Sequence, residues 1–238
     1  MCLIAIAHRA SDRFPLVIAA NRDEDYDRAT HDAHFWSDAP EVLGGRDAVA
    51  GGSWLAMTRS GRFAAVTNLR AAERKTRSRG ALVRDFVTSD VDVTSYANVI
   101  ARDAEEYAGF HLLAGAAGGE AVYVTPEVQT PLAPRVHAFS NAPAGEVWPK
   151  MTVAVEEMSV ALRMDHAASM LLVLMEFLRN PRGTASVESE VFIAGDRYGT
   201  RASTVIVVTH KEILFGEQSF TRGGIPYSKN RVFRIPRG

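Results

Sequence analysis

The chain has a single cysteine, Cys2, among its 238 residues, so no disulfide can form within it. One thiol, with no basic and then apolar leader before it, is typical of a reducing compartment, and we expect a cytoplasmic protein. The net charge of −1 gives no bulk attraction to nucleic acid or to a membrane surface. The longest apolar run, residues 167–177, is interrupted by Glu176 and falls short of the roughly 20 residues that cross a bilayer. We therefore predict no nucleic-acid partner and no membrane span.

Complete ligand sets for a metal ion are also missing from the sequence. An acidic repeat that starts at Asp23 begins like a calcium loop, but Arg28 stands at its sixth position instead of glycine and His34 at its twelfth instead of glutamate. The pair His31 and His34 could ligate a metal ion or haem, yet no matching cysteine or carboxylate set follows it. We predict no metal site and no cofactor.

The beginning of the chain carries the strongest chemical signal. Cys2 directly follows Met1, and its small side chain permits removal of the methionine, which leaves a thiol and an α-amine on one residue. The reference pKa values of these groups are about 8.5 and about 8, so the amine can take the proton of the thiol and activate it as a nucleophile. The alternative is that a lone cysteine in an apolar strand is a small buried hydrophobic residue.

Two apolar runs rich in β-branched side chains, residues 2–8 and 14–20, flank a short polar loop and predict a β-hairpin. Pairing from the loop outwards places Cys2 near Ala20 on the second strand. The chain then leaves that strand, beside the sulfur of Cys2, through four polar residues: Asn21, Arg22, Asp23 and Glu24.

The remaining chain alternates between strand and helix patterns. Strands are expected at residues 53–58, 62–68, 109–116, 120–125, 135–140, 190–194, 202–209, 212–219 and 231–235. Helices are expected at residues 80–88, 93–107 and 147–179, the last with a break near 164–166. Residues 25–52 have no clear period and are interpreted as a long polar excursion. These elements predict an α+β protein with helices packed on antiparallel sheets, in a single domain of residues 1–238.

The initial Met-Cys, the apolar hairpin and Asn-Arg-Asp-Glu together resemble the NRDE family, also known by its "transport and Golgi organisation 2" members. Further segments match the motifs of that family in the same order: Gly51-Gly52-Ser53-Trp54-Leu55, Ala65-Val66-Thr67-Asn68, Arg79-Gly80-Ala81-Leu82-Val83, Ser140-Asn141-Ala142, Trp148-Pro149-Lys150 and Tyr198-Gly199-Thr200-Arg201. One departure is His111, which stands where the family often has asparagine.

The family looks like the N-terminal-nucleophile hydrolases, so the resemblance implies an αββα sandwich of two antiparallel sheets between helix layers. It implies Cys2 as the nucleophile and Asp23 as the group that holds the α-amine or orients the thiol. The other catalytic residues that it implies are Asn141 and Asn68 for the oxyanion and Arg201 as a support for the nucleophile. Substrate-binding residues are expected among Asn21, Arg22, Glu24 and Trp54.

Two functions follow from this resemblance. The first is a hydrolase or acyltransferase that acts on a linear amide of a small molecule through Cys2. The second is a non-catalytic protein that binds or traffics haem or a lipid and is linked to secretory-pathway organisation. Cysteine-nucleophile choloylglycine-type hydrolases place an arginine where this chain has Ala20, which favours the second function. The first function is favoured by four intact residues: Cys2, Asp23, Asn141 and Arg201. In both, the expected partner is a small molecule, such as haem or an acyl compound.

Overall fold

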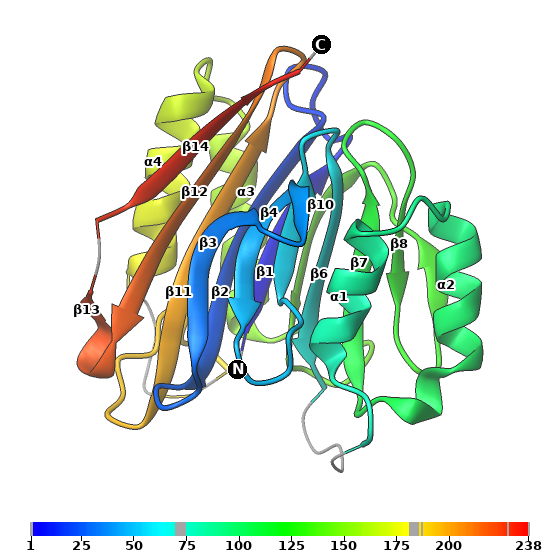
Figure 1. The fold of residues 1–238 in the computed structure, drawn as a ribbon. Coiled ribbons are helices and arrows are strands. Elements are labelled where there is room, and N and C mark those ends of the chain that lie inside the picture. The colour runs from blue at the N-terminus through cyan, green and yellow to red at the C-terminus, as the bar shows by residue number, and fades with distance from the viewer. Residues whose placement is uncertain (1, 70–74, 181–185, 187, 228, 238) are drawn as a thin grey trace. The chain divides into compact units, whose positions relative to one another are not determined.

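The computed structural model describes the chain except for residues 1, 70–74, 181–185, 187, 228 and 238. The chain divides into two compact units, which are described separately below. The first unit contains residues 1–27, 134–140 and 145–238, and the second contains residues 28–133 and 141–144. Figure 1 labels the elements of both units.

The sheet of the first unit has the order β10-β1-β2-β11-β12-β13, and β14 also pairs with β12. All its neighbouring strands are antiparallel. Its strands are β1 (Leu3–His8), β2 (Leu16–Asp25), β10 (Arg135–Ser140), β11 (Tyr198–Val208), β12 (Glu212–Thr221), β13 (Ile225–Pro226) and β14 (Arg231–Pro236). Every residue of β1 is buried; the strand lies between β10 and β2, and α3 contacts it.

Two helices, α3 (Pro149–Ala161) and α4 (Ala167–Arg179), pack against this sheet and against each other (Figure 1). α3 contacts β10 and β1, whereas α4 contacts β2, β11 and β12. The proline at the first position of α3 has no N–H to leave unpaired there, so it favours a helix start at that point. A short 3₁₀ turn, η2 (Arg222–Gly224), joins β12 to β13.

The second unit is a sheet whose strands follow one another in chain order. They are β3 (Thr30–Trp36), β4 (Ala39–Asp47), β5 (Leu55–Thr58), β6 (Arg62–Asn68), β7 (Phe110–Ala116), β8 (Ala121–Val124) and β9 (Gln129–Pro131). The helices α1 (Arg79–Val87) and α2 (Val93–Arg102) pack on it, and the 3₁₀ turn η1 (Ala104–Glu106) contacts α2. Their apolar side chains form one core with those of the sheet, including Leu82, Phe86, Ile100 and Phe110.

The α+β class, with antiparallel sheets and packed helices, is confirmed, but several local predictions were wrong. Residues 25–52 contain β3 and β4, which the polar sequence hides because β3 buries only Ala33 and Trp36. Residues 190–194 do not form a strand, and β9 was not expected. The helix predicted at residues 93–107 is confirmed as α2 but ends at Arg102, earlier than predicted.

The register of the first hairpin differs from the prediction by two residues. Ile4 pairs with Ala20, and Leu3 pairs with Asn21. The loop between the two strands runs from residue 9 to residue 15, and Arg9, with a φ of 48°, closes it by donating its N–H to the carbonyl of Pro15 at 3.0 Å. The hairpin still leads the chain from the N-terminus to the polar end of β2.

None of the helices in the described part of the chain is long and apolar enough to cross a membrane.

Candidate active site

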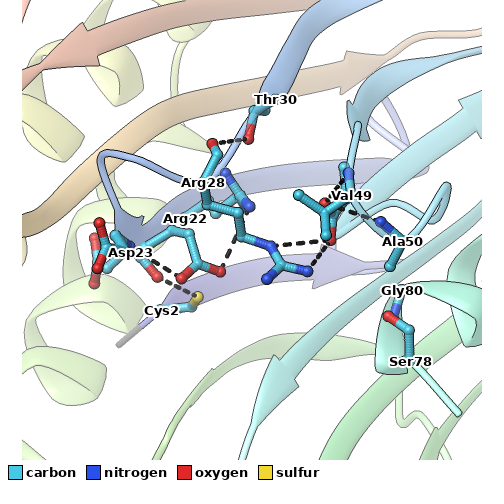
Figure 2. A network of polar contacts seen from close by, with 12 residues as sticks. Cys2, Arg22, Asp23, Arg28, Thr30, Val49, Ala50, Ser78 and Gly80 are labelled. Atoms are coloured by element: carbon cyan, nitrogen blue, oxygen red, sulfur yellow. Dashed lines mark hydrogen bonds and ion pairs between the residues drawn. The ribbon is translucent and has the colours of Figure 1, made fainter.

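Cys2 lies one residue before β1, the strand that pairs with β2 on one side and β10 on the other. Its Sγ is 3.9 Å from the main-chain carbonyl oxygen of Asp23, to which the thiol donates (Figure 2). The residue is half-buried, and it is the only thiol of the chain. The hairpin therefore brings the cysteine and the polar end of β2 together.

Asp23 is held by the strand on the far side of β2. Its Oδ1 accepts a hydrogen bond of 2.7 Å from the hydroxyl of Thr200, and its carbonyl oxygen accepts one of 3.0 Å from the hydroxyl of Tyr198. Both donors belong to β11, which pairs with β2. The side chain is buried, and burial raises the pKa of the Asp23 carboxyl, while the bond from Thr200 and the charge of Lys150 act in the opposite direction.

The ionisation of Cys2 is also controlled by its surroundings. Burial raises the pKa of the thiol, and the negative charge of Asp23 raises it further. The guanidinium of Arg22 lowers that pKa. Arg22 is itself buried and forms an ion pair of 3.5 Å with Oε2 of Glu24. The thiolate therefore depends on nearby positive charge, because a buried anion is otherwise disfavoured.

Asn21 uses both polar atoms of its side chain within the first unit. Its Nδ2 donates to the carbonyl oxygens of Leu178 at 2.8 Å and Val191 at 2.7 Å, and its Oδ1 accepts from the hydroxyl of Ser203 at 2.6 Å. These bonds tie β2 to the end of α4, to the segment before β11 and to β11 itself. A contact between Asn21 and a substrate stays a prediction.

Lys150 lies in this region but was not among the site residues predicted from the sequence. It lies in the first turn of α3 and is 1% exposed. Burial lowers the pKa of its ammonium, while the charges of Asp23 and Cys2 raise it. The signal in the sequence was present, since Trp148-Pro149-Lys150 matches a family motif, but a lysine near a helix start gives no sign that it will be buried.

Arg201 lies in an irregular part of β11, where its pairing with β2 shifts register between Thr200 and Ala202. Its guanidinium stands over the ring of Tyr26, 5.7 Å from the centroid. Its buried Nε has no hydrogen-bond partner among the described residues. The N–H at this Nε can donate to an additional anionic or carbonyl group.

The two asparagines expected to bind the oxyanion lie in the second unit, where the structure brings them together. The side-chain Nδ2 of Asn141 donates to the main-chain carbonyl of Asn68. The next residue, Ala142, accepts through its carbonyl a hydrogen bond of 2.9 Å from Nε2 of His111. Their roles toward an oxyanion stay predictions.

His111 has one tautomer in this arrangement. Because the carbonyl of Ala142 only accepts, Nε2 carries the proton, and Nδ1 accepts from the hydroxyl of Tyr123 at 2.7 Å. Burial lowers the pKa of His111, which favours this neutral form. The departure from the family pattern is thus a histidine that secures the segment carrying Asn141.

Trp54 also belongs to the second unit, where its indole packs against Gly45. A Cβ at Gly45 would lie 2.1 Å from Cη2 of that ring, so a larger residue there would displace the indole. In the same unit, Asp47 accepts hydrogen bonds from the guanidinium of Arg28 and from the N–H groups of Val49 and Ala50 (Figure 2). These bonds close the loop after β4. Substrate binding by Trp54 stays a prediction.

Metal-ligating side chains do not gather in the described part of the chain, where no group of three or more His, Cys, Asp or Glu is arranged to hold an ion. The rings of His31 and His34 stand edge to face at 6.1 Å, and Nδ1 of His34 is 2.7 Å from the carbonyl oxygen of Asp32.

Several solved structures have a fold similar to that of this chain. Penicillin V acylase from Agrobacterium tumefaciens superposes with a TM-score of 0.58 at 13% identity, covering 99% of this chain and 86% of that one. A variant of conjugated bile acid hydrolase from Clostridium perfringens gives 0.58 at 10% identity, covering 99% and 92%. The Caenorhabditis elegans orthologue of N-acylethanolamine-hydrolyzing acid amidase gives 0.50 at 15% identity, covering 87% and 92%. The chain therefore has the fold of the N-terminal-nucleophile hydrolases.

Sequence comparison gives the family. The profile of the family described as "Transport and Golgi organisation 2" matches residues 1–222, and this chain belongs to that family. The Transport and Golgi organization protein 2 homolog of Bos taurus is 33% identical, with 88% of each chain covered. The homolog of Homo sapiens is 28% identical over 95% of this chain and 94% of its own length. The Drosophila melanogaster protein of the same name is 26% identical over 93% of both.

Proposed function

We propose that this chain hydrolyses, or transfers the acyl group of, a linear amide of a small molecule, with Sγ of Cys2 as the nucleophile. The observation that carries the proposal is the placement of this thiol against Asp23, whose carboxylate and carbonyl are fixed from β11. The proteins of similar fold are named for acylase, amidase and hydrolase activities, which supports the same reaction class.

The reaction would begin with proton transfer from the thiol to a base. Once Met1, which lies outside the described residues, is removed, the base is the α-amine of Cys2, held by Asp23. The sulfur then attacks the amide carbonyl, and the asparagines Asn141 and Asn68 keep the oxyanion role predicted from the resemblance. Collapse of the tetrahedral intermediate breaks the C–N bond, the α-ammonium returns its proton to the leaving amine, and a thioester remains on the enzyme. Water or a second acceptor then takes the acyl group.

A second candidate, binding of an acyl compound without chemistry, is favoured by a groove in the first unit. The groove lies between β10 and α3, has a volume of about 430 Å³, and is lined mainly by apolar side chains: Val136, Ala138, Phe139, Val147, Met151 and Val155. Apolar pockets of this size suit small molecules with a hydrocarbon part. Binding of haem stays a prediction of the resemblance.

The test uses N-acylethanolamines of several chain lengths as substrates. Wild type should release ethanolamine, measured by mass spectrometry, and the intact mass of protein stopped during turnover should rise by one acyl group. Cys2→Ala should do neither, and Cys2→Ser should be much slower because a hydroxyl is harder to ionise than a thiol. The same spectra report whether Met1 has been removed. Equal release by wild type and Cys2→Ala would refute the proposal, and binding of the acyl compound without turnover by either protein would support the second candidate.

A further inference from the structure

Lys150 is buried at a place where two local forces oppose its charge. An ammonium loses its hydration when it is only 1% exposed, and the cost is recovered only if opposite charge lies nearby. The first turn of a helix is also the positive end of its dipole, where a cation is disfavoured. The first turn of α3 contains no acidic residue to offset this. Side chains that break local rules in this way are concentrated at functional sites.

The groups that face Lys150 come from two parts of the first unit. Asp23 and Cys2 approach it from the N-terminal hairpin, and Glu188 and Glu190 approach it from the segment after α4; all four raise the pKa of its ammonium. Asp23 is the largest of these influences, and it is buried. Glu188 is exposed and Glu190 is half-buried, so water screens their charges more strongly. Asp23 and Cys2 are therefore the groups with which the buried ammonium interacts most strongly.

The main chain and ring around Lys150 fix where its ammonium can reach. Its N–H donates to the carbonyl oxygen of Glu188 at 3.2 Å. Its Nζ lies 5.4 Å from the centroid of the Trp148 ring, a distance at which the ring attracts a cation. The first turn of α3 lies beside the start of β1, because the hydroxyl of Ser140, the residue that pairs with Leu3, donates to Sδ of Met151 at 3.5 Å.

We propose that Lys150 is a positioning residue for the nucleophile, whose buried ammonium is the counter-ion of the Cys2 thiolate. When the thiol ionises, its S–H bond breaks, the electron pair stays on sulfur and the proton goes to the α-amine or to water. Lys150 keeps its own proton throughout and stabilises the anion. This inference deepens the proposed function and rests on it only in taking Cys2 as the reacting group.

The expected size of the effect follows from charge proximity. An opposite charge within about 4–6 Å changes a pKa by about 1–3 units. Charge coupling acts on both partners, so we expect Lys150, whose pKa the charge of Cys2 raises, to lower the pKa of the thiol in turn. Arg22 also lowers the pKa of the thiol, whereas burial and the charge of Asp23 raise it. Removing the Lys150 charge should therefore leave Arg22 unable to compensate fully.

The test is the rate of Cys2 alkylation by iodoacetamide between pH 5 and 10. Because the chain has one cysteine, every thiol adduct, located by peptide mass spectrometry, reports on Cys2. In Lys150→Met, the midpoint of the pH profile should rise by about 1 unit or more, and the rate at pH 7 should fall about tenfold. Lys150→Arg should keep most of the wild-type profile. The control Lys211→Met, at an exposed lysine, should match wild type. A Lys150→Met midpoint equal to that of wild type would overturn the proposal.

A second measurement covers the case in which Lys150→Met does not fold. The chain has four lysines, so lysine labelled with ¹³C at Cε gives few signals to titrate by NMR in wild type and in Cys2→Ser. Serine does not ionise in this range, so the pKa of Lys150 should be lower in Cys2→Ser, and an unchanged value would overturn the proposal. Alkylation needs no substrate. A lysine-dependent alkylation profile without amide turnover would therefore refute the proposed function alone, and turnover with a lysine-independent profile would refute this inference alone.

Discussion

Replacing Thr200 by valine tests how strongly β11 fixes the carboxylate of Asp23. The Thr200 hydroxyl donates to Oδ1 of Asp23 at 2.7 Å and also accepts a hydrogen bond of 2.9 Å from the N–H of Ile193. Valine keeps the branched shape but removes both bonds in a fully buried position. The loss of a bond to a charged group costs about 1.5–3 kcal/mol, and the unpaired N–H adds about 1–3 kcal/mol. We expect Thr200→Val to lower the free energy of unfolding by about 3–5 kcal/mol.

The loss should also depend on pH, because only the ionised form of Asp23 needs the missing donor. Burial already raises the pKa of Asp23, so the folded state binds its proton more tightly than the unfolded state does. Stability contributed by the protonated form is therefore present at low pH and is lost as the pH rises through the folded pKa. Without the Thr200 bond, that pKa rises further. The destabilisation by Thr200→Val should consequently be larger at pH 8 than at pH 5.

The assay is urea unfolding of both proteins at the two pH values, with Thr58→Val as the matched control. The Thr58 hydroxyl bonds to the hydroxyl of Ser60 at 2.8 Å and accepts from the N–H of Arg62 at 3.0 Å, so it differs from Thr200 mainly in having a neutral partner. The decrease in the free energy of unfolding caused by Thr58→Val should be the same at both pH values. A Thr200→Val loss that is no larger at pH 8 than at pH 5 would show that Asp23 is not held as a carboxylate by this bond.

Two further predictions concern the second unit. His111→Ala should lower the free energy of unfolding by about 2–3 kcal/mol, because it removes the hydrogen bonds of the imidazole to the carbonyl of Ala142 and to the hydroxyl of Tyr123. His111→Asn keeps a donor and should lower the free energy of unfolding by less. Equal losses for the two variants in urea unfolding would contradict this prediction. Gly52→Ala would place a Cβ 2.4 Å from the carbonyl carbon of Gly80, so the thermal midpoint should fall by an amount equivalent to about 1–3 kcal/mol; an unchanged midpoint would mean that this close approach is relaxed in solution.

Much of the local structure was predictable because its signals are local. The turn after β5 uses Gly61 with a φ of 90°, and Asp92 caps α2 by accepting from the N–H of Ser95 at 2.8 Å. The break between α3 and α4 was visible in the apolar spacing of residues 147–179. The strand β3 was not visible, because it buries too few side chains to leave an alternating pattern.

The meeting of Cys2 and Asp23 was also within reach of the sequence, because a short hairpin connects them and a hairpin brings the ends of its two strands together. The two-residue error in register did not separate them, since the polar segment is longer than that error. The family resemblance extended the site to residues far apart in the chain, and membership of that family is established.

The electrostatic surroundings of the thiol were decided by tertiary structure alone. The sequence showed Ala20 where a cation was expected, with Arg22 as the nearest positive charge in the chain. The structure brings Lys150 into the neighbourhood of Asp23 and Cys2 from α3, and it brings Thr200 to Asp23 from β11. Burial and charge are properties of the packed interior, which assembles elements from distant parts of the chain, so no local pattern of residues could reveal which lysine would be buried beside the nucleophile.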